Sequence, residues 1–256
     1  MSTESVRTLC EKAGISWQEA DNATALAARL AQFVADSLQA NIDEHGQASL
    51  VVSGGSTPAP VFKQLSQASI DWTNVAVTLA DERWVPPGHA DSNESLVRNT
   101  LLVGKASGAR FVSLFRDGVS PENAVDDVAR EIETMTQPFT VTILGMGNDG
   151  HTASLFPDAP EVQLRAAMML DSQQSVAVLT PPSVNQARIT LTRAALLNST
   201  HRILHMTGEG KRQVLTDALI SSASDGQQPG EYTEGLKPII GLLTSLPEAA
   251  SVFWSQ

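Results

Sequence analysis

Short apolar runs recur along most of the chain and alternate with segments of helical periodicity. The runs are four to six residues long and rich in β-branched side chains, a pattern typical of buried strands in α/β proteins. They predict strands at Ala48–Val52, Val75–Ala80, Phe111–Phe115, Phe139–Leu144, Val176–Leu179, Arg188–Thr192 and His201–Met206, with a closing strand at Ala249–Trp254. The alternation of the two patterns indicates an α/β fold.

Amphipathic helices are expected in the intervals between these runs. Helical spacing of apolar residues predicts helices at Asp21–Ala40, Pro58–Leu65, Ser92–Leu102 and Pro121–Met135, and a further helix from within Thr207–Arg212 to about Ile220. Thr57 and Ser92 suit the N-cap positions of the second and third helices. The polar stretch Ser221–Gly230 predicts an exposed loop. Because no linker or internal repeat divides the chain, we expect a single domain over residues 1–256.

Composition and charge argue against several classes of binding partner. The 256 residues carry a formal net charge of −11, which argues against binding to nucleic acids or anionic membranes, since those ligands need basic faces. The single cysteine, Cys10, excludes an internal disulfide, and no His, Cys or carboxylate spacing matches a metal site. Neither a secretory leader nor a membrane-spanning segment is expected. These features predict a cytoplasmic protein, monomeric or a small homo-oligomer, that acts on a small molecule.

The most distinctive segment, Gly145–Pro157, follows the predicted strand Phe139–Leu144. Its glycines allow a ligand to approach the backbone, and it carries Asp149 and His151. In open α/β sheets, ligands bind beyond the carboxyl ends of the strands. An Asp and a His in this place therefore indicate a site of chemistry.

Three glycines of this segment, Gly145, Gly147 and Gly150, spell the G-x-G-x-x-G pattern of dinucleotide-binding proteins. That fingerprint requires a helix that begins at the third glycine and points its N-terminus at the pyrophosphate. Pro157 and Pro160 would interrupt such a helix. We therefore reject a dinucleotide site.

Other strand ends and one helix start carry candidate ligand groups. The turn Gly54–Thr57 has backbone N–H groups that suit an anion, although an ordinary strand-to-helix turn explains its glycines equally well. The charged segment Asp81–Arg83 follows a predicted strand, where it either meets a ligand or forms a solvated ion pair. Lys211 lies in the first turn of a predicted helix, against the preference of the helix dipole, and a bound anion would explain it.

The remaining histidines receive structural interpretations. His89 lies in a loop rich in Pro and Gly and is expected at the surface. His201 and His205 share one face of a predicted strand, where half-buried or edge positions are favoured over ligand binding.

Several motifs together resemble the 6-phosphogluconolactonase family, within the glucosamine-6-phosphate isomerase/6-phosphogluconolactonase superfamily. They are Ser-Gly-Gly-Ser-Thr-Pro at 53–58, Asp-Glu-Arg-Trp-Val-Pro at 81–86 followed by Ser92-Asn93, the segment 145–157, and two shorter matches at 188–192 and 208–211. The resemblance runs from about Val51 to Leu215. It implies a modified Rossmann-like α/β fold, with a mostly parallel sheet and helices on both faces, and no required metal or redox cofactor.

The resemblance implies hydrolysis of 6-phospho-D-glucono-1,5-lactone to 6-phosphogluconate, the second step of the oxidative pentose phosphate pathway. Related glucosamine-6-phosphate deaminases usually continue the Gly-x-Asp-Gly-His element as Ile-Ala-Phe-Asn-Glu-Pro and have Asp-Glu-Tyr at the second motif. Thr152–Pro157 and Asp81–Trp84 therefore favour the lactonase. Two alternatives stay open: a deaminase or isomerase in which Asp81 abstracts a proton, and a non-catalytic sugar-phosphate sensor.

On this basis we assign roles to the candidate residues. His151 is expected to be the general base, because a neutral imidazole can take a proton from water at neutral pH. Asp149 either fixes the tautomer of His151 or contacts the substrate. The residues expected to bind substrate are Gly54, Gly55, Ser56, Thr57, Asp81, Arg83, Gly147, Arg188 and Lys211. Among these, the turn, Arg188 and Lys211 are assigned to the phosphate.

The tetrahedral intermediate needs donors for its oxyanion, and the backbone around Gly147 and Gly150, or Arg83, suits that task. No covalent nucleophile is required, because a lactone has a good leaving group. Ser154 lacks a G-x-S-x-G elbow and Cys10 has no identifiable partner, so neither is favoured as a nucleophile.

Overall fold

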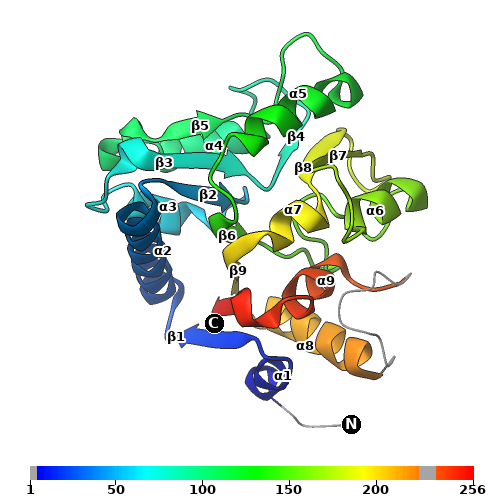
Figure 1. Ribbon diagram of the computed structural model, residues 1–256. Coiled ribbons are helices and arrows are strands. Elements are labelled where there is room, and N and C mark those ends of the chain that lie inside the picture. The colour runs from blue at the N-terminus through cyan, green and yellow to red at the C-terminus, as the bar shows by residue number, and fades with distance from the viewer. Residues whose placement is uncertain (1–4, 225–234) are drawn as a thin grey trace.

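A seven-stranded sheet forms the centre of the computed structural model, which describes residues 5–224 and 235–256 (Figure 1). In spatial order its strands are β1 (Ser16–Ala20), β10 (Ala250–Ser255), β9 (Ser199–Thr207), β6 (Phe139–Leu144), β2 (Ala48–Val52), β3 (Val75–Leu79) and β5 (Arg110–Val112). Every neighbouring pair is parallel. The predicted α/β fold is confirmed, and β1, which was not predicted, extends the sheet beyond the closing strand.

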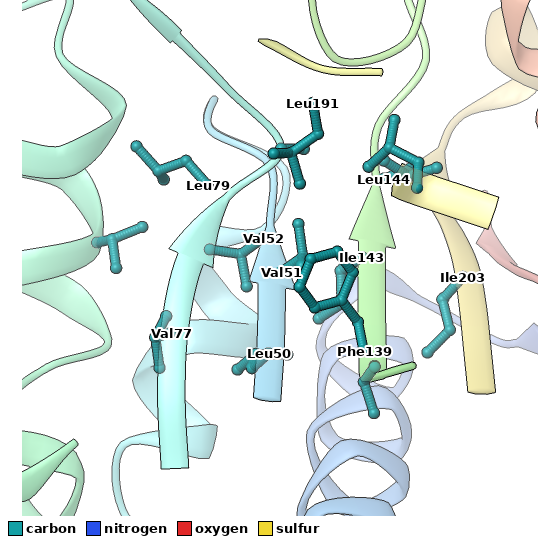
Figure 2. Packing of buried hydrophobic residues seen from close by; sticks show 14 of the residues in the cluster. Leu50, Val51, Val52, Val77, Leu79, Phe139, Ile143, Leu144, Leu191 and Ile203 are labelled. Carbon is teal, nitrogen blue, oxygen red and sulfur yellow. The ribbon is translucent and has the colours of Figure 1, made fainter. Parts of the chain in front are cut away.

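Helices cover both faces of this sheet (Figure 1). Within the described residues they are α1 (Val6–Lys12), α2 (Ala23–His45), α3 (Ala59–Leu65), α4 (Asn93–Thr100), α5 (Pro121–Glu133), α6 (Glu161–Met168), α7 (Arg193–Leu197), α8 (Glu209–Ser224) and α9 (Pro238–Thr244). Ile203 of β9 packs in the same core cluster as α2, whereas Leu204 and Met206 pack with α8 and α9. Figure 2 shows the apolar side chains of β2, β3 and β6 inside the first cluster. None of the described helices is long and apolar enough to cross a bilayer.

The predicted helices correspond to α2, α3, α4, α5 and α8, with differences at several ends. Helix α2 continues to His45, beyond the predicted end at Ala40. Thr57 is not the N-cap of α3, because the first helical hydrogen bond runs from the N–H of Phe62 to the carbonyl of Pro58. The loop predicted from Ser221 begins inside α8, which continues to Ser224. The rest of that predicted loop lies outside the described residues.

A second, antiparallel sheet joins β4 (Asp81–Arg83), β8 (Arg188–Leu191) and β7 (Val176–Leu179). The strands β7 and β8 agree with the sequence pattern. By contrast, β4 consists of charged residues that the pattern placed after a strand. It becomes a strand because it pairs with β8, with Arg83 opposite Arg188.

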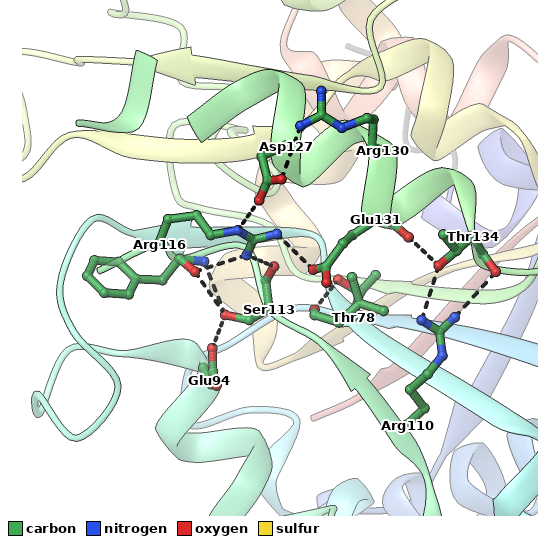
Figure 3. Close-up of polar contacts among 11 residues, drawn as sticks. Thr78, Glu94, Arg110, Ser113, Arg116, Asp127, Arg130, Glu131 and Thr134 are labelled. Atoms are coloured by element: carbon green, nitrogen blue, oxygen red, sulfur yellow. Dashed lines mark hydrogen bonds and ion pairs between the residues drawn. The ribbon is translucent and has the colours of Figure 1, made fainter. Parts of the chain in front are cut away.

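Arg116, in the segment after β5, forms ion pairs with two carboxylates of α5 (Figure 3). Its guanidinium lies 2.5 Å from a carboxylate oxygen of Asp127 and 2.8 Å from one of Glu131, and it also donates to the carbonyl of Ser113. The outer edge of the sheet is therefore tied to its covering helix by charged contacts that are partly exposed.

Two buried arginines, Arg193 and Arg202, donate hydrogen bonds to backbone carbonyls of α9 and of neighbouring segments. Arg193 donates to the carbonyls of Gly241 and Met168, and Arg202 donates to those of Leu242 and Leu246. Positive groups at the carbonyl end of a helix are favoured by its dipole. Burial lowers the pKa of each arginine to about 10.

The start of α9 in turn contacts the loop after β6. The N–H of Ile239 donates to the carbonyl of Gly150 at 3.2 Å. The backbone of Gly150 has a φ of +87°, and the side chain of Lys237 fills the space that a Cβ would need. Helix α9 therefore supports the loop that carries His151.

Glu82, in the middle of β4, is completely buried, and its carboxylate accepts four hydrogen bonds. The donors are the N–H groups of Arg83, Asn93 and Glu94, at 2.7–2.8 Å, and the hydroxyl of Ser92, at 3.0 Å. Burial raises the pKa of Glu82, and these hydrogen bonds oppose the rise. The carboxylate thus fastens the N-terminus of α4 to β4.

Replacing Glu82 with alanine removes the common acceptor of these four donors. A buried donor without a partner costs about 1–3 kcal/mol, partly relieved where water can enter. We expect the free energy of unfolding of Glu82→Ala to fall by roughly 3–5 kcal/mol. Urea denaturation at neutral pH measures this change.

Glu133→Ala is the matched control, because Glu133 is an exposed glutamate on α5. A surface substitution of this kind changes stability by about 0.5 kcal/mol or less. Equal losses of stability in the two variants would contradict the role given to Glu82.

Candidate active site

The carboxyl ends of β2, β3, β6 and β9 open into a cavity of about 440 Å³ that β4 and β8 enclose on one side. Most of the predicted site residues line it: Gly54, Gly55, Thr57, Asp81, Arg83, Gly147, His151, Arg188 and Lys211. Ser56, in the same turn, is exposed and does not line the cavity. Asp149 contacts His151 and does not line the cavity either. The parallel sheet therefore gathers segments that are far apart in the sequence.

His151 and Asp149 form a hydrogen-bonded pair. The Nδ1 atom of His151 lies 2.6 Å from Oδ1 of Asp149, which also accepts the backbone N–H of His151 at 3.1 Å. The ring stacks on Phe156, with 4.1 Å between the ring centroids. Because Nδ1 is engaged by the carboxylate, Nε2 is the ring nitrogen available to a ligand.

The charge state of Asp149 follows from its neighbour. Burial acts to raise the pKa of this carboxyl, but the hydrogen bonds and charge of His151 together lower it below its ordinary value. An ionised Asp149 accepts the Nδ1 proton and so selects the tautomer of His151 with a lone pair on Nε2.

Gly147 makes room for this pair. A Cβ at Gly147 would lie 2.2 Å from Nδ1 of His151 and 2.4 Å from Oδ1 of Asp149. Its N–H donates to the carbonyl of His151, and the N–H of Gly150 donates to the carbonyl of Gly147. Neither N–H is therefore free for an oxyanion, so the expected donors must come from other N–H groups of this loop or from Arg83.

The side chain of Asn93 lies against both Asp81 and the turn after β2. The amide of Asn93 donates to the carbonyl of Asp81 at 2.9 Å, and a Cβ at Gly54 would lie 1.8 Å from Oδ1 of Asn93. Ser154 is fully buried and donates to the Asp81 carboxylate at 2.5 Å. Its hydroxyl is thus engaged outside the cavity lining, consistent with the view that it is not a nucleophile.

Cationic side chains from different elements line the cavity. On one side, Arg83 and Arg188 each have a buried Nε atom without an acceptor among the described residues. Burial lowers the pKa of Arg188 while the charge of Asp81 opposes the shift. On the other side, Lys211 donates to the carbonyl of Met146 at 2.6 Å, and burial lowers its pKa as Asp149 opposes the change. Unpartnered cationic donors favour a ligand with anionic oxygens.

The turn after β2 adds further donors. Within the described residues, the backbone N–H groups from Gly54 to Thr57 have no hydrogen-bond acceptor. Gly55 has a φ of +96°, a conformation that L side chains rarely adopt. Gly54, Gly55 and Thr57 line the cavity, so the turn has N–H groups available to a ligand there.

Several lining residues were not predicted as site residues, and Asn93 and His205 are two polar examples. Asn93 stands next to the N-cap Ser92, and its place in the family-like motif was the available signal. His205 is 5% exposed and lines the cavity, so a half-buried or edge position is wrong for it. That interpretation does fit His201, which is half-buried against Phe33.

A metal ion and the cysteine thiol are the other groups that could supply chemistry. In residues 5–224 and 235–256, no group of three or more His, Cys, Asp or Glu side chains could hold a metal ion. Cys10 is buried among apolar side chains, and burial raises the pKa of its thiol to about 12.

Comparisons with known proteins agree with this geometry. The family model for glucosamine-6-phosphate isomerases/6-phosphogluconolactonase matches residues 21–237. A protein from Pseudomonas aeruginosa named 6-phosphogluconolactonase is 42% identical over 81% of this chain and 86% of its own. One of the same name from Mesorhizobium japonicum is 38% identical over 95% and 96%.

A crystal structure of a 6-phosphogluconolactonase from Shewanella baltica has a TM-score of 0.86 and 40% identity, covering 94% of this chain and 98% of its own. The match of the family model extends over most of the chain, and it includes all the motifs that line the cavity. This chain belongs to the glucosamine-6-phosphate isomerase/6-phosphogluconolactonase family.

Proposed function

We propose that this chain hydrolyses 6-phospho-D-glucono-1,5-lactone to 6-phospho-D-gluconate, the second step of the oxidative pentose phosphate pathway. The observation that carries the proposal is a His–Asp pair at the wall of a cavity that also holds unpartnered cationic donors. A base for water and an anion site for phosphate are the two requirements of this substrate. The relatives named 6-phosphogluconolactonase support the same assignment.

In the proposed mechanism, Nε2 of His151 takes a proton from water as the oxygen attacks the lactone carbonyl. Asp149 holds the imidazole through Nδ1 and stabilises the imidazolium that forms. The ring C–O bond then breaks, and the imidazolium returns the proton to the departing ring oxygen. The pair thus acts first as base and then as acid.

The other lining residues divide between the two ends of the substrate. Lys211, Arg188 and the turn Gly54–Thr57 bind the phosphate, through cationic side chains and backbone N–H groups. Arg83, with its unpartnered Nε, is the donor proposed for the oxyanion, and Asp81 binds sugar hydroxyls.

We further propose that residues 1–256 form one domain, a monomer or small homo-oligomer, that works in the cytoplasm without binding nucleic acid. The net charge of −11 and the continuous parallel sheet support this description. The reaction as written needs no metal or redox cofactor.

The chain should accelerate opening of freshly prepared 6-phosphogluconolactone, followed as proton release at neutral pH and corrected for spontaneous hydrolysis. His151→Ala should lower kcat/KM by about 100- to 10,000-fold, because it removes the general base. Near-normal turnover by a folded His151→Ala variant would remove His151 from this role. Ammonia release from glucosamine 6-phosphate by the wild-type chain would instead support a deaminase.

Asp149→Asn tests the hydrogen bond within the pair. The wild-type carboxylate is ionised, so it can only accept the proton of Nδ1, which leaves the lone pair on Nε2. The asparagine amide can instead donate to Nδ1, which places the ring proton on Nε2, so kcat/KM at neutral pH should fall by about 100- to 10,000-fold.

Asp126→Asn removes the same charge from an exposed position on α5 and should leave kcat/KM unchanged. Equal kcat/KM in the Asp149→Asn and wild-type proteins would contradict the role given to Asp149.

Lys211→Met should raise the KM for the phosphorylated lactone by roughly 10- to 100-fold, since a charge-assisted hydrogen bond contributes about 1.5–3 kcal/mol. Turnover of unphosphorylated glucono-1,5-lactone should change far less. Lys63→Met, at an exposed position on α3, is the control. Equal losses on both lactones would place Lys211 outside the phosphate site.

A further inference from the structure

His205 is a polar side chain in a place that the proposed mechanism does not use. It lies near the carboxyl end of β9, is 5% exposed and lines the cavity. Its Nδ1 atom is buried and has no hydrogen-bond partner in the part of the chain that the structure describes. Buried polar groups normally have partners, so an unpaired one beside a cavity indicates a ligand.

Strand register places His205 level with the turn after β2. Val52 pairs with Ile143, and Ile143 pairs with Ile203, so these three residues form one row across β2, β6 and β9. Two residues further along each strand direction lie Gly54, Gly145 and His205. Side chains two residues apart share a face, so His205 points to the face of Ile203, on which α2 packs.

The turn Gly54–Thr57 leads to α3, which packs against α2 on that same face. Between the turn and His205, a Cβ added to Gly145 would meet no atom within 4 Å. Lys211, six residues after His205, reaches the same cavity from α8. Gly145, the turn, Lys211 and His205 therefore line one cavity, and the space beside Gly145 is open.

The ring of His205 is neutral at physiological pH, because burial lowers its pKa to about 4. A neutral imidazole has one N–H donor. It therefore adds a donor to an anion site without adding a charge.

We propose that His205 is a further substrate-binding residue, whose imidazole donates a hydrogen bond to a phosphate oxygen between the Gly54–Thr57 turn and Lys211. The identity of the phosphate as part of a sugar lactone rests on the proposed function. The binding of a phosphate group at this place does not, and it is measurable without turnover.

The test compares His205→Leu, His205→Gln and His201→Leu by calorimetry with inorganic phosphate and with 6-phosphogluconate. His205→Leu should raise both Kd values about tenfold, because the ligand loses one hydrogen bond to a charged group. His205→Gln should stay within about threefold of wild type, since its amide keeps a donor. His201→Leu is the matched control, because His201 is on the same strand but does not line the cavity.

In assays of the lactone, His205→Leu should raise the KM about tenfold with little change in kcat, and should leave unphosphorylated lactone unaffected. Phosphate binding by His205→Leu equal to that of wild type would overturn the proposal, as would equal losses on both lactones. A wild-type chain that binds phosphate but does not open the lactone would refute the proposed function. The role of His205 in phosphate binding would still be tested by the calorimetric comparison of the variants.

If His205→Leu does not fold, ¹⁵N NMR of the wild-type histidines replaces it, with His205→Gln used to assign the ring signals. Addition of phosphate should shift the ring nitrogens of His205 and leave those of His201 in place. Unchanged His205 signals at saturating phosphate would overturn the proposal.

Discussion

The parallel pairing of β2, β6 and β9 brings three strand ends to one edge of the sheet. From that edge emerge the turn Gly54–Thr57, the loop with Asp149 and His151, and the segment that leads to Lys211. Parallel strands require long crossover connections, which is why these segments are far apart in the sequence. The relative positions of the turn, His151 and Lys211 depend on this pairing.

Close packing then limits which residues can occupy the edge. Glu82 holds the start of α4, so Asn93 is fixed beside Asp81 and occupies the space where a side chain at residue 54 would lie. At residue 147 the His–Asp pair occupies the corresponding space. These two glycines are therefore required by the neighbouring polar groups and leave the backbone open to a ligand. A buried carboxylate thus determines the shape of a cavity that it does not touch.

The sequence predicts those parts whose cause is local. Ala48–Val52 and Phe139–Leu144 have the bounds that their apolar runs indicate, because strands buried on both faces select apolar residues at each position. Candidate site residues were found because strand ends share an edge. By contrast, β4 depends on pairing with β8, and the burial of His205 depends on the loops around it. Such long-range contacts leave no periodic pattern in the chain.

The attachment of α9 has a consequence for the conditions that the site tolerates. Arg193 and Arg202 bind backbone carbonyls, and α9 in turn supports Gly150 in the loop of His151. Carbonyl oxygens do not titrate, and buried contacts are little screened by salt. Acid and high ionic strength loosen assemblies made of exposed ion pairs, such as those of Arg116, but they leave this support in place. The loop that carries His151 is therefore supported by contacts that acid and salt weaken little.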